Sequence, residues 1–381
     1  MAIPTDPIWV NTLDQLTELC QRWRTQAAIA VDTEFMRSDT FYPIAGLIQI
    51  GDGQGCYLID PLAFDDLTPL TELMLDEQVT KVLHACSEDL EVFNTLLGAV
   101  PGPIFDTQIG AAFAGCGFSL GYAALARDLL GVEIPKGETR SDWLQRPLSV
   151  AQLKYAALDV AHLLIVYGKL LQRLKADDRL SWVKSDCADL VAAARQEADL
   201  DGYYTRVGLG WKLQPKGLAV LRALSYWREV EARERNIPRN RLMKEQPMYE
   251  LARQLPDQVN QLKRIEGMPR RTITEDGETL LDIIAQELAT PSESWPERLD
   301  PPLGREYGSW MKALKAYVLT QAESHELPPE VLIRKKEYEA IVRSAIVGAP
   351  QLPERLNGWR YDVIGAGLLQ KVQQLRDGAN A

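Results

Sequence analysis

The chain has 381 residues, of which 46% are hydrophobic and 25% are charged, as is typical of a globular protein with two or three domains. Its formal net charge is −11, with 42 Lys and Arg against 53 Asp and Glu, which excludes a protein that is basic throughout. The five scattered cysteines form no C-x-x-C pair, and neither a signal peptide nor an apolar run of roughly 20 residues is evident. We therefore expect a cytoplasmic protein with reduced thiols, no zinc site and no membrane span.

The N-terminal part of the chain combines a few strands with a helix. A strand at Trp9–Val10 and a helix that ends near Trp23 come first, and Ile29–Phe35 is the next predicted strand. Two apolar segments then flank five residues rich in glycine, which predicts an antiparallel hairpin of Leu47–Ile50 with Cys56–Ile59.

Helices and strands alternate from there to about residue 175. Lys81–Ala85 and Ile104–Asp106 are predicted strands, Ser87–Leu97 is a predicted helix between them, and helices fill the rest. An antiparallel hairpin joined to alternating strands and helices predicts a mixed α/β sheet with helices on both faces.

The remainder of the chain shows only helix and loop patterns, and these contain a repeat. Ile237-Pro238-x-x-x-Leu242 recurs 90 residues later as Leu327-Pro328-x-x-x-Leu332. The repeat predicts two copies of one small helical domain, with chance similarity between helices as the alternative. The predicted organisation is an α/β domain at 1–175, a helical linker at 176–210, a first helical domain at 211–290, a linker at 291–302 and a second helical domain at 303–375.

Two carboxylates within the strand Ile29–Phe35 form the first candidate site. Asp32 and Glu34 are two residues apart, so their side chains point to the same face of the strand. Neighbouring carboxylates repel each other when buried, and a hard divalent cation such as Mg²⁺ or Mn²⁺ prefers oxygen ligands of this kind. The alternative is a solvated strand end, which the spacing alone does not exclude.

Three residues further along the chain fit this pair. Asp89 lies in the first turn of a predicted helix that follows a strand, where its side chain can reach the edge of the sheet. Tyr155 and Asp159 share one face of a predicted helix, and only one of the 13 tyrosines is followed by Asp at the fourth position. Four such carboxylates can hold two metal ions at a phosphodiester, and the tyrosine hydroxyl can position the attacking water.

The order of these residues resembles that of the DEDDy 3′-5′ exonucleases of the ribonuclease-H-like fold, and the surrounding sequence resembles ribonuclease D more narrowly. The segments that carry the narrower resemblance are Val31–Phe35, Leu47–Ile50, His84–Leu90, Phe105–Gln108 and Arg140–Trp143. The helical repeat resembles two HRDC (helicase and RNase D C-terminal) domains, so the resemblance covers nearly the whole chain.

The resemblance implies a metal-dependent 3′-5′ exoribonuclease that releases nucleoside 5′-monophosphates from RNA 3′ ends, with tRNA precursors as the expected substrates. It implies two divalent ions, Mg²⁺ or Mn²⁺, with Asp32, Glu34 and Asp159 as ligands and Asp89 holding the second ion, directly or through water. Tyr155 is expected to orient the nucleophile.

The middle motif departs from that of polymerase-type relatives. Many of these have Asn several residues before the Asp and an aromatic residue just before it, whereas His84 and Glu88 stand near those places here. This departure leaves the substrate contacts open and the metal ligands intact. His84 is either a substrate contact or a structural histidine, and Phe35 and Phe93 are either base-stacking or core residues.

Basic residues gather in the first predicted helical domain. Residues 212–271 carry 14 Lys and Arg against 7 Asp and Glu, a net charge of +7 in an acidic chain. Arg239 and Arg241 lie in the densest part, which predicts a surface that follows RNA phosphates, with a solvated helix face as the alternative. Two other functions remain open, a DNA exonuclease of the same fold and a non-catalytic RNA-binding module.

Overall fold

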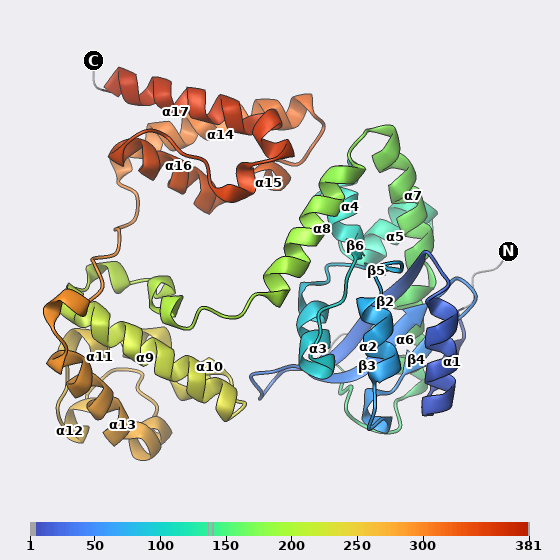
Figure 1. Cartoon of the computed structure of the whole chain (residues 1–381), viewed down its shortest axis with the longest axis horizontal. Coiled ribbons are helices and arrows are strands. Elements are labelled where there is room, and N and C mark those ends of the chain that lie inside the picture. Colours follow the sequence, from blue (N-terminus) through green and yellow to red (C-terminus); the bar gives the residue numbers. More distant parts are fainter. Residues whose placement is uncertain (1–4, 136, 139–140, 380–381) are drawn as a thin grey trace. The chain divides into compact units, whose positions relative to one another are not determined.

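The computed structural model describes residues 5–135, 137–138 and 141–379 (Figure 1). The start of the chain and Arg140, which carry part of the signal-peptide and resemblance arguments, lie outside these residues. The chain forms two compact units. The larger unit comprises the chain up to Met36, Ile44–Gln196 and the chain from Leu303 onward, and the smaller unit comprises Arg37–Pro43 and Glu197–Pro302.

A six-stranded mixed sheet is the centre of the larger unit, with strand order β1-β4-β3-β2-β5-β6. Strand β3 pairs antiparallel with β2 and β4, and the other pairs are parallel. This arrangement confirms the predicted mixed sheet and its hairpin. The strands are β1 (Pro7–Val10), β2 (Ala28–Met36), β3 (Ile44–Gly51), β4 (Cys56–Ile59), β5 (Thr80–Leu83) and β6 (Ile104–Asp106).

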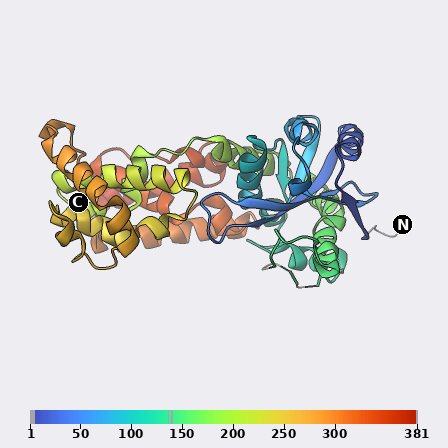
Figure 2. The same cartoon turned by 90° about the horizontal axis from the view of Figure 1, so that it is seen from below.

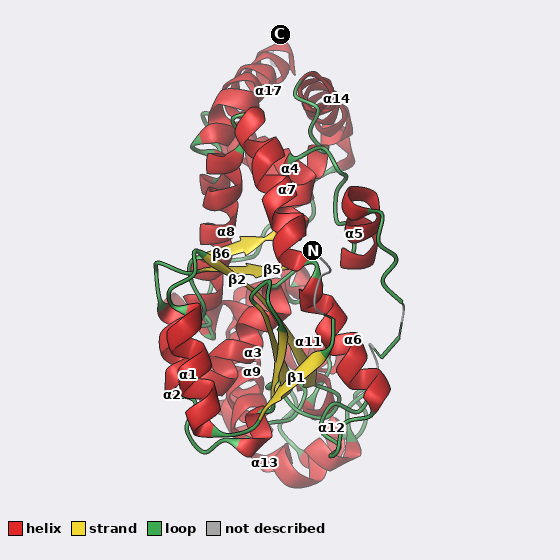
Figure 3. Ribbon diagram, turned by 90° about the vertical axis from the view of Figure 1, so that its right-hand side faces the viewer, coloured by secondary structure: helices red, strands yellow, loops and turns green. Residues whose placement is uncertain are grey.

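Helices cover both faces of this sheet (Figures 2 and 3). Helix α3 packs against β2 and β3, whereas α6 packs against β2, β3 and β4 from the opposite face. In chain order, the helices of this part are α1 (Leu13–Trp23), α2 (Thr68–Leu75), α3 (Ser87–Leu97), α4 (Thr107–Phe113), α5 (Tyr122–Leu130), α6 (Val150–Ala161), α7 (Leu163–Ala176) and α8 (Leu180–Arg195). The site residues therefore come from a strand and from helices on its two sides.

One stretch, Val150–Ala176, is long and apolar enough to cross a membrane by length and composition alone, contrary to the expectation that no such run exists. In the structure this stretch is α6 followed by α7. Several of its apolar side chains, among them Val160, Val166 and Leu170, pack against the sheet and its neighbouring helices. The buried face of this stretch is part of the core of the larger unit.

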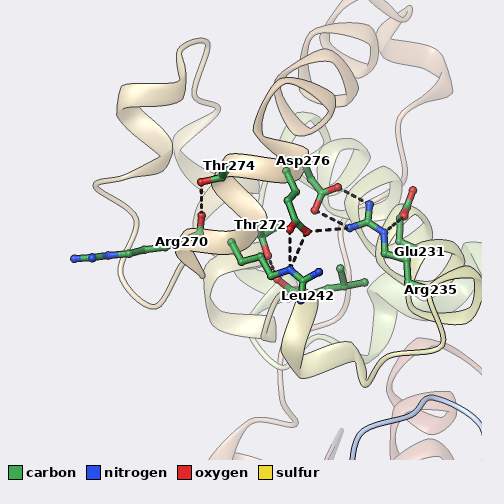
Figure 4. A network of polar contacts seen from close by, with 9 residues as sticks. Glu231, Arg235, Leu242, Arg270, Thr272, Thr274 and Asp276 are labelled. Carbon is green, nitrogen blue, oxygen red and sulfur yellow. Dashed lines mark hydrogen bonds and ion pairs between the residues drawn. The ribbon is translucent and has the colours of Figure 1, made fainter.

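The smaller unit is built from helices around its own apolar core. Its long helices are tied together by polar contacts, which Figure 4 shows from close by. Arg235 donates two hydrogen bonds to Asp276 and one to Glu231, and the Thr272 hydroxyl donates to the Leu242 carbonyl. Its helices are α9 (Pro215–Glu234), α10 (Arg239–Leu242), α11 (Glu245–Gln254), α12 (Val259–Leu262) and α13 (Arg270–Ala289).

The second helical repeat has the same order of long and short helices as the first, and it belongs to the larger unit. In both repeats a long helix ends shortly before a residue with left-handed backbone, Asn236 at φ 49° and Glu326 at φ 50°, and a four-residue helix follows. Trp359 stacks on Trp182 of α8 with ring centroids 4.6 Å apart. The helices of this repeat are α14 (Gly308–Ser324), α15 (Pro329–Leu332), α16 (Lys335–Val347) and α17 (Ala366–Ala379).

Candidate active site

Three of the predicted carboxylates meet in the structure. Asp32 and Glu34 point to the face of β2 that α6 covers, and Asp159 comes from α6 itself. One carboxylate oxygen from each of these residues lies within 4.8 Å of the other two. A donor set of three carboxylates fits a hard divalent cation, because oxygen ligands and negative charge are what such ions prefer.

Helix α6 begins with a capping box that fixes where its side chains point. The Gln152 backbone N–H donates to the Ser149 hydroxyl at 3.2 Å, and the Ser149 N–H donates to the Gln152 side chain at 2.9 Å. One turn further on, the Tyr155 hydroxyl hydrogen-bonds to the Asp159 carboxylate. Tyrosine and carboxylate therefore lie side by side, as their spacing of four residues predicted.

The loop before α6 packs against the Tyr155 ring. The Trp143 ring is buried and packs on the Tyr155 ring, with centroids 6.2 Å apart. Arg146 fastens this loop to the sheet, because it donates to the carbonyls of Trp143 and Gly46 at 2.9 and 2.7 Å and to the carboxylate of Asp60. Gly46 lies where the register of β2 and β3 shifts, and a Cβ there would come within 2.6 Å of the Trp143 carbonyl oxygen.

Asp89 approaches from the opposite face of β2. Its carboxylate is buried in the first turn of α3 and accepts a hydrogen bond of 2.5 Å from the Thr33 hydroxyl. The turn before α3 is held by Asp106, whose carboxylate accepts the backbone N–H groups of Ala85 and Cys86 at 3.1 and 2.9 Å. Thr33 and Asp106 were not predicted as site residues, although both stand inside the segments that carry the family resemblance.

All four carboxylates have raised pKa values, and burial is the largest cause for each. Burial and the neighbouring carboxylates Asp159 and Asp89 raise the pKa of Glu34 to about 8, and burial raises the pKa of Asp159 to about 7. The pKa of Asp89 is raised to about 6 by burial, against the hydrogen bond from Thr33. Burial and three neighbouring carboxylates likewise raise the pKa of Asp32 well above its usual range. Without a cation, these carboxyl groups therefore hold protons at pH values where free carboxyl groups are ionised.

A pH dependence of stability follows from these pKa values. Because the folded, metal-free protein holds protons that the unfolded chain releases, its melting temperature should fall as the pH rises from about 4.5 to about 8. A divalent cation binds the ionised carboxylates, so added Mg²⁺ or Mn²⁺ should raise the melting temperature more at about pH 8 than at about pH 5.5. Thermal melts at both pH values measure this difference, and Glu34→Gln should reduce it. An equal gain at both pH values would contradict the prediction.

The predicted substrate contacts lie in three different environments. Phe93 is completely buried in the core of the larger unit, so it is a packing residue in this structure. Phe35 is half-buried, directly after the register shift of β2. His84 is half-buried, and its ring nitrogens lie 2.9 Å from the Thr107 hydroxyl at the start of α4 and 3.0 Å from the Leu120 carbonyl in the loop before α5.

The basic residues of the first repeat are largely engaged within the smaller unit. Arg239 and Arg233 each donate a hydrogen bond of 2.6 Å to the fully buried Glu229 carboxylate, and both guanidinium groups lie 4.6 Å from the centre of the Phe41 ring. Burial acts to raise the pKa of Glu229, but these hydrogen bonds lower it overall. Arg241 is exposed and pairs with the exposed Asp39.

Known proteins resemble this chain over most of its length. A family model for a 3′-5′ exonuclease matches residues 7–175, and a model for the HRDC domain matches residues 217–284. Ribonuclease D of Pseudomonas paraeruginosa is 47% identical over 366 residues, which cover 96% of this chain and 97% of the relative. Ribonuclease D of Escherichia coli is 36% identical over 372 residues, which cover 96% and 98%.

Solved structures show the same similarity in three dimensions. The crystal structure of Escherichia coli RNase D, described as an exoribonuclease involved in structured RNA processing, matches with a TM-score of 0.91 at 34% identity. The match covers 97% of this chain and 99% of that chain. The catalytic core of RRP6 from Trypanosoma brucei matches with a TM-score of 0.58 at 23% identity, which indicates a shared fold.

Proposed function

The chain belongs to the ribonuclease D family and is a 3′-5′ exoribonuclease, and from this premise we propose how it acts and on what. The proposed reaction is hydrolysis of the last phosphodiester bond at an RNA 3′ end, which releases a nucleoside 5′-monophosphate. The cluster of Asp32, Glu34 and Asp159 beside Tyr155 carries this proposal.

Enzymes of this family depend on metal ions, and the carboxylates fit the ions that we propose. Asp32, Glu34 and Asp159 would hold one Mg²⁺ or Mn²⁺, and Asp89 would hold a second ion together with Asp32. When bound, such ions offset the charge of the scissile phosphate and acidify a water molecule. Thr33 keeps Asp89 facing β2, so the fourth carboxylate is already oriented before RNA enters.

Tyr155 orients the attacking water in this proposal. Burial and the neighbouring carboxylates raise the pKa of its hydroxyl, so the phenol stays protonated at neutral pH and does not act as a base. Its hydroxyl lies at the Asp159 carboxylate and is therefore placed to form a hydrogen bond to the attacking water. Trp143 holds the aromatic ring in place, so this hydroxyl is positioned with little freedom.

The substrate is proposed to be structured RNA, with tRNA precursors that carry 3′ extensions as the specific class. The support is the full-length similarity to a protein described as an exoribonuclease involved in structured RNA processing. We place the reaction in the cytoplasm, because the chain's scattered cysteines are all free.

A digestion experiment tests the reaction and its direction. Matched RNA and DNA, each labelled at the 3′ or the 5′ end, should be incubated with and without Mg²⁺ or Mn²⁺. We expect early release of the 3′ label as a mononucleotide, only with metal, and faster on RNA than on DNA because of contact with the 2′-hydroxyl. Equal rates on RNA and DNA would favour the DNA-exonuclease alternative, and no cleavage would favour the RNA-binding module.

We propose that the second helical repeat is a second HRDC domain. The family model matches only residues 217–284, so the support comes from the repeat itself. The long helices α9 and α14 are followed by the short helices α10 and α15 and then by α11 and α16, with left-handed residues at matching places. Gly267 and Gly358 also match in sequence and in left-handed backbone.

RNA binding in the first repeat is proposed for exposed basic residues around one turn. Lys263, Arg264 and Arg270 are exposed on either side of the α12–α13 turn, and Arg270 points away from the polar network in Figure 4. Arg239 is placed less well for RNA, because its guanidinium lies on Glu229 and Phe41. A phosphate-binding surface therefore fits the turn better than it fits α10.

Charge reversal at the turn should weaken RNA binding. We expect Arg264→Glu with Arg270→Glu to lower affinity for a long RNA and to reduce the slope of log affinity against log salt by about one for each lost phosphate contact. Cleavage of a di- or trinucleotide should not change. The matched control is Arg253→Glu, which reverses an exposed arginine of α11 in the same unit. An unchanged salt slope would exclude this surface.

A further inference from the structure

One buried side-chain amide, on the strand next to β2, has no visible role in the fold. Gln49 lies in the middle of β3 and is fully buried, yet neither its Nε2 nor its Oε1 has a hydrogen-bond partner among the described residues. An unpaired buried polar group costs about 1–3 kcal/mol, so such a group is rare unless it serves a purpose.

The strand register places this amide next to Asp32. Gln49 and Asp32 are directly opposite each other in the antiparallel β2–β3 pair, and opposite residues project to the same face. Their Cβ atoms are therefore about 4.5–5.5 Å apart, within reach for a glutamine side chain. On its other side Gln49 faces Leu58 of β4, which offers no polar atom in its side chain. Asp32 is thus the polar neighbour that the sheet provides.

A second unpaired donor lies on the same face. The Trp143 indole N–H is buried and has no partner among the described residues. Trp143 packs in a cluster with Leu47 and Leu58, and these two residues flank Gln49 along β3 and across β4. An amide oxygen is the acceptor that this indole lacks, and an amide N–H is the donor that a neighbouring carboxylate accepts.

We propose that Gln49 is a positioning residue for the metal ligand Asp32. In the metal-loaded site its Nε2–H donates to the Asp32 carboxylate, while its Oε1 accepts the Trp143 indole N–H. This bond would hold Asp32 in one orientation toward the cation, as the hydrogen-bond partners of metal ligands commonly do. The inference rests on the proposed metal site and goes beyond it, because it assigns a positioning role to Gln49, which touches neither the metal ion nor the RNA.

The test separates metal affinity from stability. Gln49→Met keeps the length and volume of the side chain and removes the amide, so the metal-free protein should melt at the wild-type temperature or slightly above it. Its affinity for Mn²⁺ alone, measured by isothermal titration calorimetry without RNA, should be about 10-fold weaker than that of the wild type. The matched control is Leu58→Met, which changes the opposite neighbour of Gln49 on the same face and should bind Mn²⁺ as the wild type does.

Each outcome supports or overturns the positioning role of Gln49. Weakened Mn²⁺ binding in Gln49→Met with an unchanged melting temperature supports the positioning role, and Mn²⁺ affinity within twofold of the wild type overturns it. Equal losses in Gln49→Met and Leu58→Met would also overturn it, because they would show a packing effect. If Gln49→Met does not fold, Gln49→Leu takes its place. Failure of the proposed reaction is distinguishable, because it would appear as wild-type protein that binds Mn²⁺ and leaves RNA uncleaved.

Discussion

Asp32→Asn should abolish RNA cleavage, with a loss on the order of 10³-fold or more, the scale expected when a central member of a catalytic group is removed. Asp32 is central because a carboxylate oxygen of Glu34 and one of Asp159 lie within 4.8 Å of its own carboxylate oxygen. The charge of Asp89 also raises the pKa of Asp32. An amide in its place removes the charge that attracts the cation and leaves one oxygen where two were available. The fold should persist, because the change relieves repulsion among the remaining carboxylates in the metal-free protein.

The measurement is single-turnover cleavage of a short RNA across a titration of Mn²⁺, combined with a thermal melt of the metal-free protein. Asp128→Asn is the matched control, because it makes the same chemical change at an exposed position on α5. Cleavage by Asp32→Asn near the wild-type rate at saturating Mn²⁺ would refute the assignment of this residue. A lower melting temperature than that of Asp128→Asn would indicate a structural role instead.

Local periodicity explains why three of the carboxylates could be predicted from the sequence. The alternation of side chains along a strand places Asp32 and Glu34 on one face, and the helical repeat places Tyr155 beside Asp159. Both rules depend on backbone geometry within a few residues, which the sequence pattern specifies well. Asp89 was predicted from its place in the first turn of a helix after a strand, but its partner Thr33 was not, because Thr33 is distant from it in the chain.

The residues that escaped prediction depend on tertiary contacts. Whether Phe93 stacks on a base or packs in the core depends on the elements that cover α3, and the structure buries it completely. The count of positive charges around Arg239 could not show that the buried carboxylate of Glu229 pairs with three of them, Arg228, Arg233 and Arg239. Likewise, no local pattern indicates that Arg37–Pro43, between two strands of the sheet, packs with the first helical repeat.

Tyr155→Phe should slow the chemical step by roughly 10²-fold and leave metal and RNA binding almost unchanged. The phenylalanine ring keeps the packing against Trp143, and only the hydroxyl at Asp159 is lost. Because the raised pKa of this hydroxyl keeps it protonated, its loss removes a hydrogen bond that orients water and no charge that the cation would sense. Asp159→Asn, one helical turn away, should instead weaken metal binding and turnover together, since Asp159 belongs to the close cluster of carboxylates.

Single-turnover cleavage across a Mn²⁺ titration distinguishes the two roles within this one helix. For Tyr155→Phe the maximal rate should fall while the Mn²⁺ concentration at half-maximal rate stays at the wild-type value. For Asp159→Asn both quantities should change, and Mn²⁺ binding measured without RNA should weaken as well. Tyr167→Phe is the matched control, because Tyr167 lies on the adjoining helix α7 and packs against Phe105, away from the carboxylates. A wild-type maximal rate for Tyr155→Phe would make Tyr155 a packing residue, and a shifted Mn²⁺ requirement would show that its hydroxyl supports the metal site itself.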